Sequence, residues 1–133
     1  MSLEQPGKRT YMWVTKNPLG EEVAVANETY ETHIIGDHPD DKARELVNLH
    51  VKGVIEEPRY IYYDQKHEEN KRIRYIDYVS LEEYNKIQSL VVVVDTDREP
   101  NEIVTWSVKS NTRQEKINGG VIYDSRKNTR KSN

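Results

Sequence analysis

Two histidines stand close together in the segment THIIGDHPDD, residues 32–41. His33 and His38 are five residues apart, which differs from the four-residue interval of a zinc-binding HExxH helix. Three aspartates in the same segment leave a metal site with a carboxylate ligand open as an alternative. Histidine ordinarily titrates near physiological pH, so both side chains could transfer protons in acid–base catalysis. The structural alternative is a turn or helix-cap role for His38 and a half-buried position for His33.

The other two histidines carry weaker signals. His50 falls at the edge of the apolar face of a predicted helix, which is typical of a structural histidine. His67 lies in the charged segment QKHEENK, where we expect it to be solvated.

A late segment, EIVTWSVKS at residues 102–110, supplies hydroxyl groups and a cation. Arginines 72 and 74 of RIRYIDY add cations on another predicted strand. If Arg74 and Lys109 meet near Thr105, they form a site that suits a phosphate, because Arg offers a two-pronged fork and Lys a point charge. A solvated sheet face gives the same pattern. Alternation predicts two faces for the strand: Ile103, Thr105, Ser107 and Lys109 on one, and Val104, Trp106 and Val108 in the core.

These residue types together fit the cleavage of RNA by attack of its 2′-hydroxyl. The reaction needs a base for that hydroxyl, an acid for the leaving oxygen and cations around the phosphate. It needs neither a metal ion nor a cofactor, and we expect neither. The sequence has no GxGxxG and no GxxxxGK[ST] motif, which argues against dinucleotide and P-loop chemistry.

The composition of the chain limits the number of domains, the kinds of site and the partners that we expect. The 133 residues fit one domain, and the absence of Cys excludes disulfides, thiolate metal sites and Cys nucleophiles. The net charge of -3 gives no global basic footprint, so any RNA contact must use a local patch. No apolar run is long enough for a membrane span, and no signal peptide is visible, so we expect a cytoplasmic protein without membrane contact.

The predicted elements give an α+β fold. We expect an N-terminal β-hairpin and one or two helices packed on a four- to five-stranded, mainly antiparallel sheet. Residues 1–9 are predicted to be a disordered leader, 10–125 a single domain, and 126–133 a basic disordered tail. Strands are predicted over residues 10–15, 21–27, 59–64, 72–81, 89–96, 102–110 and 121–125, and the 89–96 strand is expected to be central. A helical turn is predicted over 28–32 and a helix over 41–56. Residues 82–88 are an ambiguous segment that could form a helical turn, and loops are predicted over 65–71 and 111–120.

The order of these features resembles the phage-associated nuclease-like families of the barnase–EndoU–colicin–RelE fold group. The resemblance covers residues 22–125 and rests on the order of several motifs: HIIGDHPD, VIEEPRYIYYD, RIRYIDYV, SLVVVVDT, EIVTWSVKS and GGVIYDS. It implies one or two helices on a four-stranded antiparallel sheet. It also implies a metal-independent ribonuclease acting as a toxin or a phage-encoded effector.

Matched position by position, the resemblance assigns roles. His33 corresponds to the general base or acid, and His38 to its partner or to a phosphate contact. Thr105 corresponds to the threonine that holds a phosphate oxygen or orients the scissile group, and Arg74 lies on the strand whose basic residue faces the phosphate. Asp37 stands where relatives often carry a basic residue, so it either repels phosphate or pairs with a histidine, and an inactive or repurposed member stays open. Tyr123 and Ser125 are weaker matches of the final motif. The residues assigned to substrate binding are Tyr123, together with Lys109 and Ser107 from the polar face of the 102–110 strand.

The sequence therefore predicts a metal-independent ribonuclease-like domain of phage or mobile-element origin, with RNA as substrate and an inhibitor or phage protein as a further partner. The oligomeric state is left open. The alternative is a non-catalytic binding or structural accessory domain whose polar sheet face contacts a protein. Binding of a small anionic ligand on that face is a third hypothesis. Clustering of His33, Arg74 and Thr105 in one cleft would favour the enzyme, and scatter over separate surfaces would favour binding.

Overall fold

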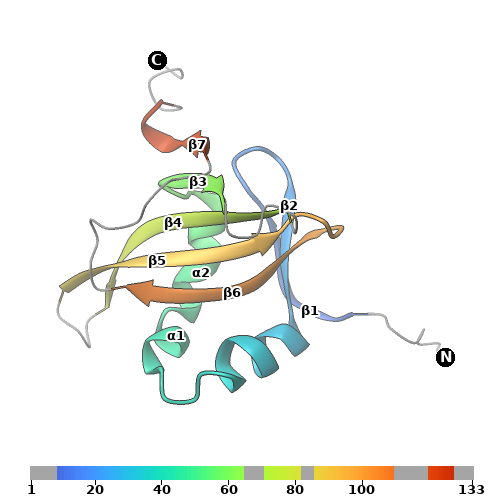
Figure 1. Cartoon of the computed structure of the whole chain (residues 1–133), viewed down its shortest axis with the longest axis vertical. Coiled ribbons are helices and arrows are strands. Elements are labelled where there is room, and N and C mark those ends of the chain that lie inside the picture. Colours follow the sequence, from blue (N-terminus) through green and yellow to red (C-terminus); the bar gives the residue numbers. More distant parts are fainter. Residues whose placement is uncertain (1–8, 65–70, 82–85, 110–119, 128–133) are drawn as a thin grey trace.

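The structure is a computed structural model that describes residues 9–64, 71–81, 86–109 and 120–127. It is an α+β fold, as predicted, built on one seven-stranded sheet in the order β1-β2-β6-β5-β4-β3-β7 (Figure 1). The strands are β1 (Tyr11–Lys16), β2 (Glu22–Ala26), β3 (Tyr60–Tyr63), β4 (Arg72–Leu81), β5 (Lys86–Asp95), β6 (Asn101–Lys109) and β7 (Val121–Asp124). The helical segments are η1 (Thr29–Gly36), α1 (Lys42–Leu46) and α2 (Asn48–Glu56).

The sheet has more strands than the four to five that were predicted for it. The N-terminal hairpin does form, but β2 also joins the main sheet by pairing with β6 in parallel, Val23 with Asn101 and Ala24 with Glu102. At the opposite edge, β7 pairs with β3. Both pairings join segments far apart in the sequence, and strand patterning within each segment carries no signal for its partner.

The turn of the hairpin is built by Asn17. Its side-chain oxygen accepts hydrogen bonds from the backbone N–H groups of Leu19 and Glu21, both at 2.9 Å. Gly20 has a φ of 85°, a left-handed conformation that favours glycine. The predicted turn at KNPLG is thereby confirmed and brings β1 and β2 together.

The central position of the apolar strand is confirmed. Strand β5 lies fourth of the seven; Val91, Val92 and Val94 of its valine run are buried, on both faces of the sheet, and Val93 is partly buried. The ambiguous segment predicted as a helical turn begins outside the described residues, but residues 86–88 are part of β5, so the strand is longer than expected. Its N-terminal half pairs with the end of β4.

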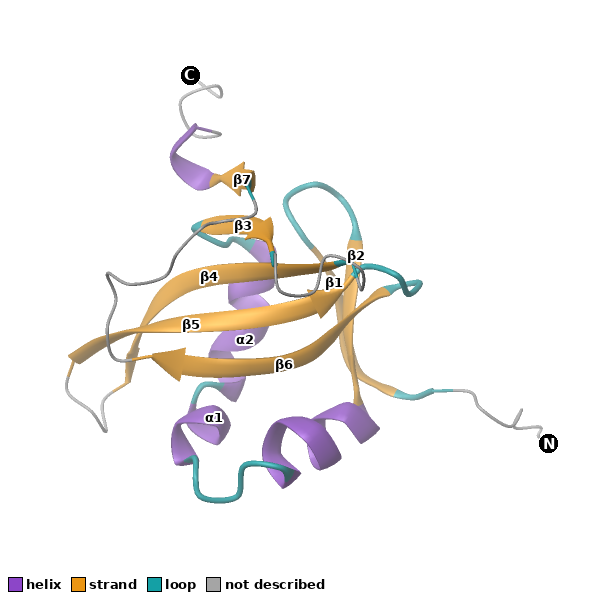
Figure 2. Ribbon diagram, in the orientation of Figure 1, coloured by secondary structure: helices purple, strands orange, loops and turns teal. Residues whose placement is uncertain are grey.

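The helices pack on one face of the sheet, where Figure 1 shows α2 crossing behind the long strands β4, β5 and β6. The single helix predicted over 41–56 is divided at Val47 into α1 and α2. The helical turn predicted over 28–32 is extended into the eight-residue π-helix η1 (Figure 2). The core between these layers contains fully buried Trp106, Tyr75, Ile34, Ile55 and Ile61.

A β-bulge in β6 breaks the predicted alternation of that strand. Val93 of β5 pairs with Thr105, whereas the next residue, Val94, pairs with Ile103, so Val104 has no partner across the strands. Ile103 is therefore buried in the core with Trp106, and Val104 is only partly buried. The prediction that placed Ile103 beside Thr105, and Val104 in the core, was wrong at these two positions. Bulges of this kind re-aim neighbouring side chains.

None of the helices in the described parts of the chain combines the length and apolarity that crossing a bilayer requires. The predicted leader lies outside the described residues except for Arg9, and the predicted tail except for residues 126–127. The predicted loops at 65–71 and 111–120 also fall mostly outside the described residues, and so does His67.

Candidate functional site

A surface cleft brings together side chains from η1, β4, β6, the β5–β6 connection and the segment before β1. Two of the predicted catalytic residues, His33 and His38, line it beside a third, Thr105. Three arginines that come from separate parts of the sequence surround them. The residues lining the cleft are Arg9, Glu28, Thr29, His33, Asp37, His38, Arg72, Arg98, Val104 and Thr105.

His33 reaches the cleft from the wide helix η1. A π-helix closes through hydrogen bonds to the fifth residue along the chain, and it needs room at Gly36. A Cβ built at Gly36 would lie 2.5 Å from the carbonyl oxygen of Glu31, so a side chain there would force the turn apart. Glycine in THIIGDH therefore permits the turn that presents His33.

The imidazole of His33 is paired with Asp37, whose Oδ2 lies 3.3 Å from Nδ1. A hydrogen on Nδ1 would be donated to this carboxylate, which leaves Nε2 with a lone pair for accepting a proton. Both side chains are exposed, with 62% of the His33 side chain open to solvent. The acid that the sequence left ambiguous between repelling phosphate and pairing with a histidine thus pairs with His33.

His38 follows η1 in a tight turn, in which its backbone N–H donates to the carbonyl oxygen of Ile35 at 3.1 Å. Its own carbonyl accepts from Asp41 at 3.0 Å, just before α1. The predicted turn position of His38 is confirmed. Its ring forms no hydrogen bond with any residue in the described part of the chain, and it faces the cleft.

Thr105 comes to the cleft from the bulged part of β6. Its hydroxyl oxygen accepts a hydrogen bond of 3.2 Å from Nη1 of Arg44, which also donates to the Trp106 carbonyl. Arg44 is itself held by Asp41, with Nε 3.0 Å from Oδ2. Because Arg44 has only donors, the Thr105 hydroxyl keeps its own hydrogen for a partner in the cleft.

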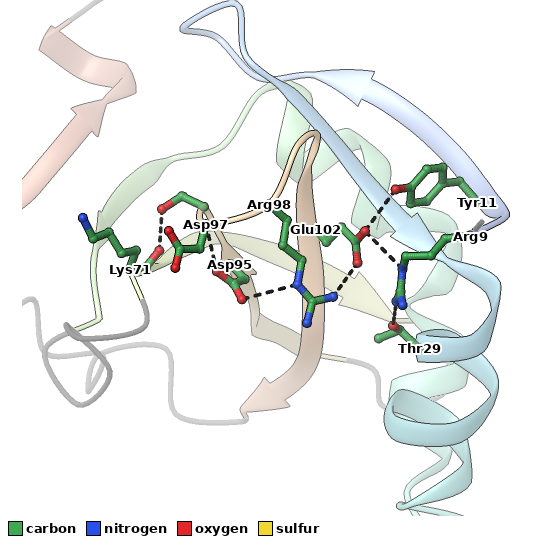
Figure 3. Close-up of polar contacts among 9 residues, drawn as sticks. Arg9, Tyr11, Thr29, Lys71, Asp95, Asp97, Arg98 and Glu102 are labelled. Carbon is green, nitrogen blue, oxygen red and sulfur yellow. Dashed lines mark hydrogen bonds and ion pairs between the residues drawn. The ribbon is translucent and has the colours of Figure 1, made fainter. Parts of the chain in front are cut away.

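The two arginines Arg9 and Arg98 converge on one buried carboxylate, that of Glu102 (Figure 3). Nη1 of Arg98 donates to Oε1 at 2.8 Å, and Nε of Arg9 lies 3.2 Å from Oε2. The Tyr11 hydroxyl donates to the same Oε2 at 3.0 Å. Burial, with the hydrogen bond and negative charge of Glu102, raises the pKa of Tyr11, so this donor keeps its proton at neutral pH.

Arg72 is the third arginine of the cleft. It stands opposite Asp95 in the β4–β5 register, but Asp95 pairs with Arg98 and also accepts from the backbone of Asp97. The Arg72 side chain makes no hydrogen bond or ion pair with any residue that the structure describes, and its Nε is buried. A guanidinium at the wall of a cleft that has no partner among the described residues is ready to bind an anion.

The other predicted site residues lie elsewhere. Arg74 does not line the cleft, and its Nε lies 3.4 Å from the buried carboxylate of Asp64. Lys109 pairs across the strands with Ser89, four residues beyond Thr105, so the two predicted cations do not meet beside that threonine. Ser107 stands two pairs further along β6 than Thr105, opposite Val91. Tyr123 and Ser125 line a separate pocket, beside Arg59 and Asp77.

Several cleft residues were missed from the sequence. Arg9 was assigned to the leader, Arg98 to a turn, and neither Glu102 nor Arg44 was selected. The signal for Arg98 was its place in DREPNE, a dense charged turn directly before the strand of Thr105. Nothing in the local sequence indicates that Arg9 reaches Thr29 and Glu102, which lie 20 and 93 positions away.

The arrangement can bind an oxyanion and move protons. Guanidinium groups and a hydroxyl supply hydrogen-bond donors, and two imidazoles supply a base and an acid. In the described part of the chain, no group of three or more His, Asp or Glu side chains is placed to hold a metal ion.

The chain matches one family of known proteins. A family model described as phage-Barnase-EndoU-ColicinE5/D-RelE like nuclease2 matches residues 4–124. Searches of curated proteins and of solved structures gave no match. The matched range includes every cleft residue and nearly the whole chain, so the protein belongs to this phage nuclease-like family.

Proposed function

We propose that the protein is a metal-independent ribonuclease that cleaves RNA in this cleft by acid–base catalysis of its two histidines. The observation that carries the proposal is the meeting of His33, His38, Thr105 and Arg72 around one cavity. These residues come from η1, its following turn, β6 and β4, and only the fold brings them together. Membership of the nuclease-like family supports the same reading.

The base in this proposal is His33. With Nδ1 directed at Asp37, Nε2 accepts the proton of the RNA 2′-hydroxyl as that oxygen attacks the adjacent phosphorus. The imidazolium that forms is stabilised by the Asp37 carboxylate, 3.3 Å away.

The acid is His38. It gives its proton to the departing 5′-oxygen, so the products are a 2′,3′-cyclic phosphate and a 5′-hydroxyl end. Its ring has no protein partner among the described residues, which suits a group that must contact the leaving oxygen.

The phosphate is held by Arg72 and Thr105. Arg72 offers a guanidinium that no described acid neutralises, and Thr105 offers a hydroxyl hydrogen that Arg44 leaves unused. Both donors would strengthen their hydrogen bonds as charge grows on the phosphate oxygens, which is the usual source of transition-state stabilisation. Arg74, selected from the sequence for this role, is replaced in the proposal by Arg72.

The test is cleavage of total RNA by the purified protein in the presence of a chelator. We expect the wild type to cleave, and His33→Ala to lower the rate by a factor of about 10² to 10⁴, the scale for losing an acid–base group. His50→Ala is the matched control, because His50 is an exposed histidine that does not line the cleft, and the edge-of-core position predicted for it is not observed. Equal rates for wild type and His33→Ala would remove His33 from the mechanism, and no cleavage by the wild type would leave a binding domain.

A further inference from the structure

The Arg9, Glu102 and Arg98 side chains form a cluster whose function goes beyond the acid–base step. Glu102 is 3% exposed, and both of its oxygens are occupied, Oε1 by Arg98 and Oε2 by Arg9 and Tyr11. A carboxylate so enclosed cannot contact a ligand. It lies between the two guanidinium groups and holds both of them, as Figure 3 shows.

Both arginines retain donors for a ligand. Arg98 and Arg9 are 46% and 34% exposed and line the cleft. Arg9 also donates through Nη2 to Thr29 at 3.1 Å, which fixes its plane. Nη2 of Arg98 and Nη1 of Arg9 form no hydrogen bond within the described residues, so both groups present N–H donors that are already oriented.

The acids around the cluster do not cancel this capacity. Glu102 is the carboxylate in closest contact and is shared between two cations. Asp95 lies 3.6 Å from Nε of Arg98, and Glu28 lies 3.9 Å from Nη1 of Arg9, both longer than a good charge-assisted hydrogen bond. The Glu28 side chain is largely exposed and can swing away at little cost.

The cluster is separated from the phosphate site of Arg72 and Thr105. In the sheet register, Arg72, Asp95 and Glu102 form one row across β4, β5 and β6. Two strand spacings set the backbone of Glu102 about 10 Å from that of Arg72. One nucleic acid strand can place two phosphates along the cleft, one at each set of donors.

We propose that the Arg9–Glu102–Arg98 cluster is a second phosphate-binding subsite, so that the RNA substrate is held at a phosphate adjacent to the one that is cleaved. This deepens the proposed function and rests on it for the identity of the first phosphate. Arg9 and Arg98 contact the ligand, and Glu102 is a positioning residue that acts through them.

The experiment measures binding of 2′-deoxy dinucleotides, which lack the attacking hydroxyl and are not turned over. One ligand has only the internal phosphate, and two others add a 5′- or a 3′-terminal phosphate. We expect the wild type to bind at least one terminally phosphorylated ligand about tenfold more tightly than the parent, the scale of one charge-assisted contact.

Arg98→Ala and Glu102→Gln should reduce that gain to less than about twofold, while binding of the parent ligand stays nearly unchanged. Arg126→Ala is the matched control, because it removes an arginine that does not line the cleft, and it should keep the full gain. No gain in the wild type, or a gain that survives in both variants, would overturn the subsite. Absence of RNA cleavage by the wild type would instead overturn the proposed function, since the deoxy ligands report binding alone.

Discussion

Nη1 of Arg44 donates a hydrogen bond of 3.2 Å to the hydroxyl oxygen of Thr105. The contact joins α1 to β6, and it is reinforced because the Trp106 indole donates back to the Arg44 carbonyl at 2.9 Å. An arginine that is 13% exposed thus fixes the direction of a hydroxyl at the cleft wall. Helix α1 therefore orients a donor for the proposed substrate.

The first prediction concerns this contact. Arg44→Lys should lower kcat/KM for RNA about tenfold, because the shorter point charge no longer fixes the Thr105 hydroxyl. In a Thr105→Val background the same change should alter kcat/KM by less than about twofold, since the group it acts on is gone. The double-mutant cycle is measured with thermal unfolding of all four proteins. Equal losses in both backgrounds would show that Arg44 acts only on stability.

The second prediction separates Arg72 from Arg74. Arg72→Ala should weaken binding of phosphate-containing ligands and lower RNA cleavage about a hundredfold, with little change in unfolding free energy, because Arg72 makes no described ion pair. Arg74→Ala should mainly destabilise the fold, by about 3 kcal/mol, because it removes a cation 3.4 Å from a buried carboxylate, that of Asp64. Chemical denaturation and cleavage assays on the two variants decide. If Arg74→Ala mainly lost cleavage and Arg72→Ala mainly lost stability, phosphate binding would be assigned to Arg74 instead.

Much of the fold could be predicted from local pattern. The β4 strand has the predicted limits, and the apolar run around residues 90–94 was correctly placed at the centre. The missing information was non-local: the parallel pairing of β2 with β6 and the addition of β7 depend on which edges meet in space. The residues of a strand indicate how deeply the strand is buried, but they do not indicate which strand it pairs with.

The candidate site divides in the same way. His33, His38 and Thr105 could be selected from residue type and motif order, and the structure places them in one cleft. Arg74 was selected from the sequence, whereas Arg72 lines the cleft. Alternation puts both arginines on one face of the sheet, so only their positions along the strand distinguish them. Selecting Arg9 and Glu102 would have required knowledge of a contact between residues 93 positions apart, and no local sequence pattern predicts such a contact.

The third prediction concerns the Asp37 carboxylate. Asp37→Asn should lower the cleavage rate about tenfold, because an amide no longer stabilises the imidazolium that His33 forms during proton abstraction. The expected loss is modest, because this pair is exposed and screened by solvent. Asp40→Asn is the control, since it removes a nearby exposed carboxylate that does not line the cleft. If both variants lose activity equally, the effect of Asp37 is one of general charge.

The last prediction concerns stability at high pH. Burial raises the pKa of Tyr75 to about 12, against the hydrogen bond donated by Asn17, which lowers it, and with the charge of Glu21, which adds to the rise. The folded state then holds the phenolic proton at a pH where the unfolded chain, with a pKa near 10, releases it. The contribution is therefore fully present below about pH 10 and is lost as pH rises toward 12, by about 3 kcal/mol.

Tyr75→Phe removes this titration. At pH 7 the variant should be less stable by about 1 kcal/mol, because the Asn17 amide loses an acceptor that lies 2.8 Å away. Between pH 10 and 12, however, its unfolding free energy should fall less steeply than that of the wild type, and the two curves should cross. Urea denaturation across this range measures both. Parallel curves would show that the Tyr75 phenol does not control the alkaline loss of stability, and that other groups with raised pKa values, such as Tyr11 and Tyr30, must be considered in its place.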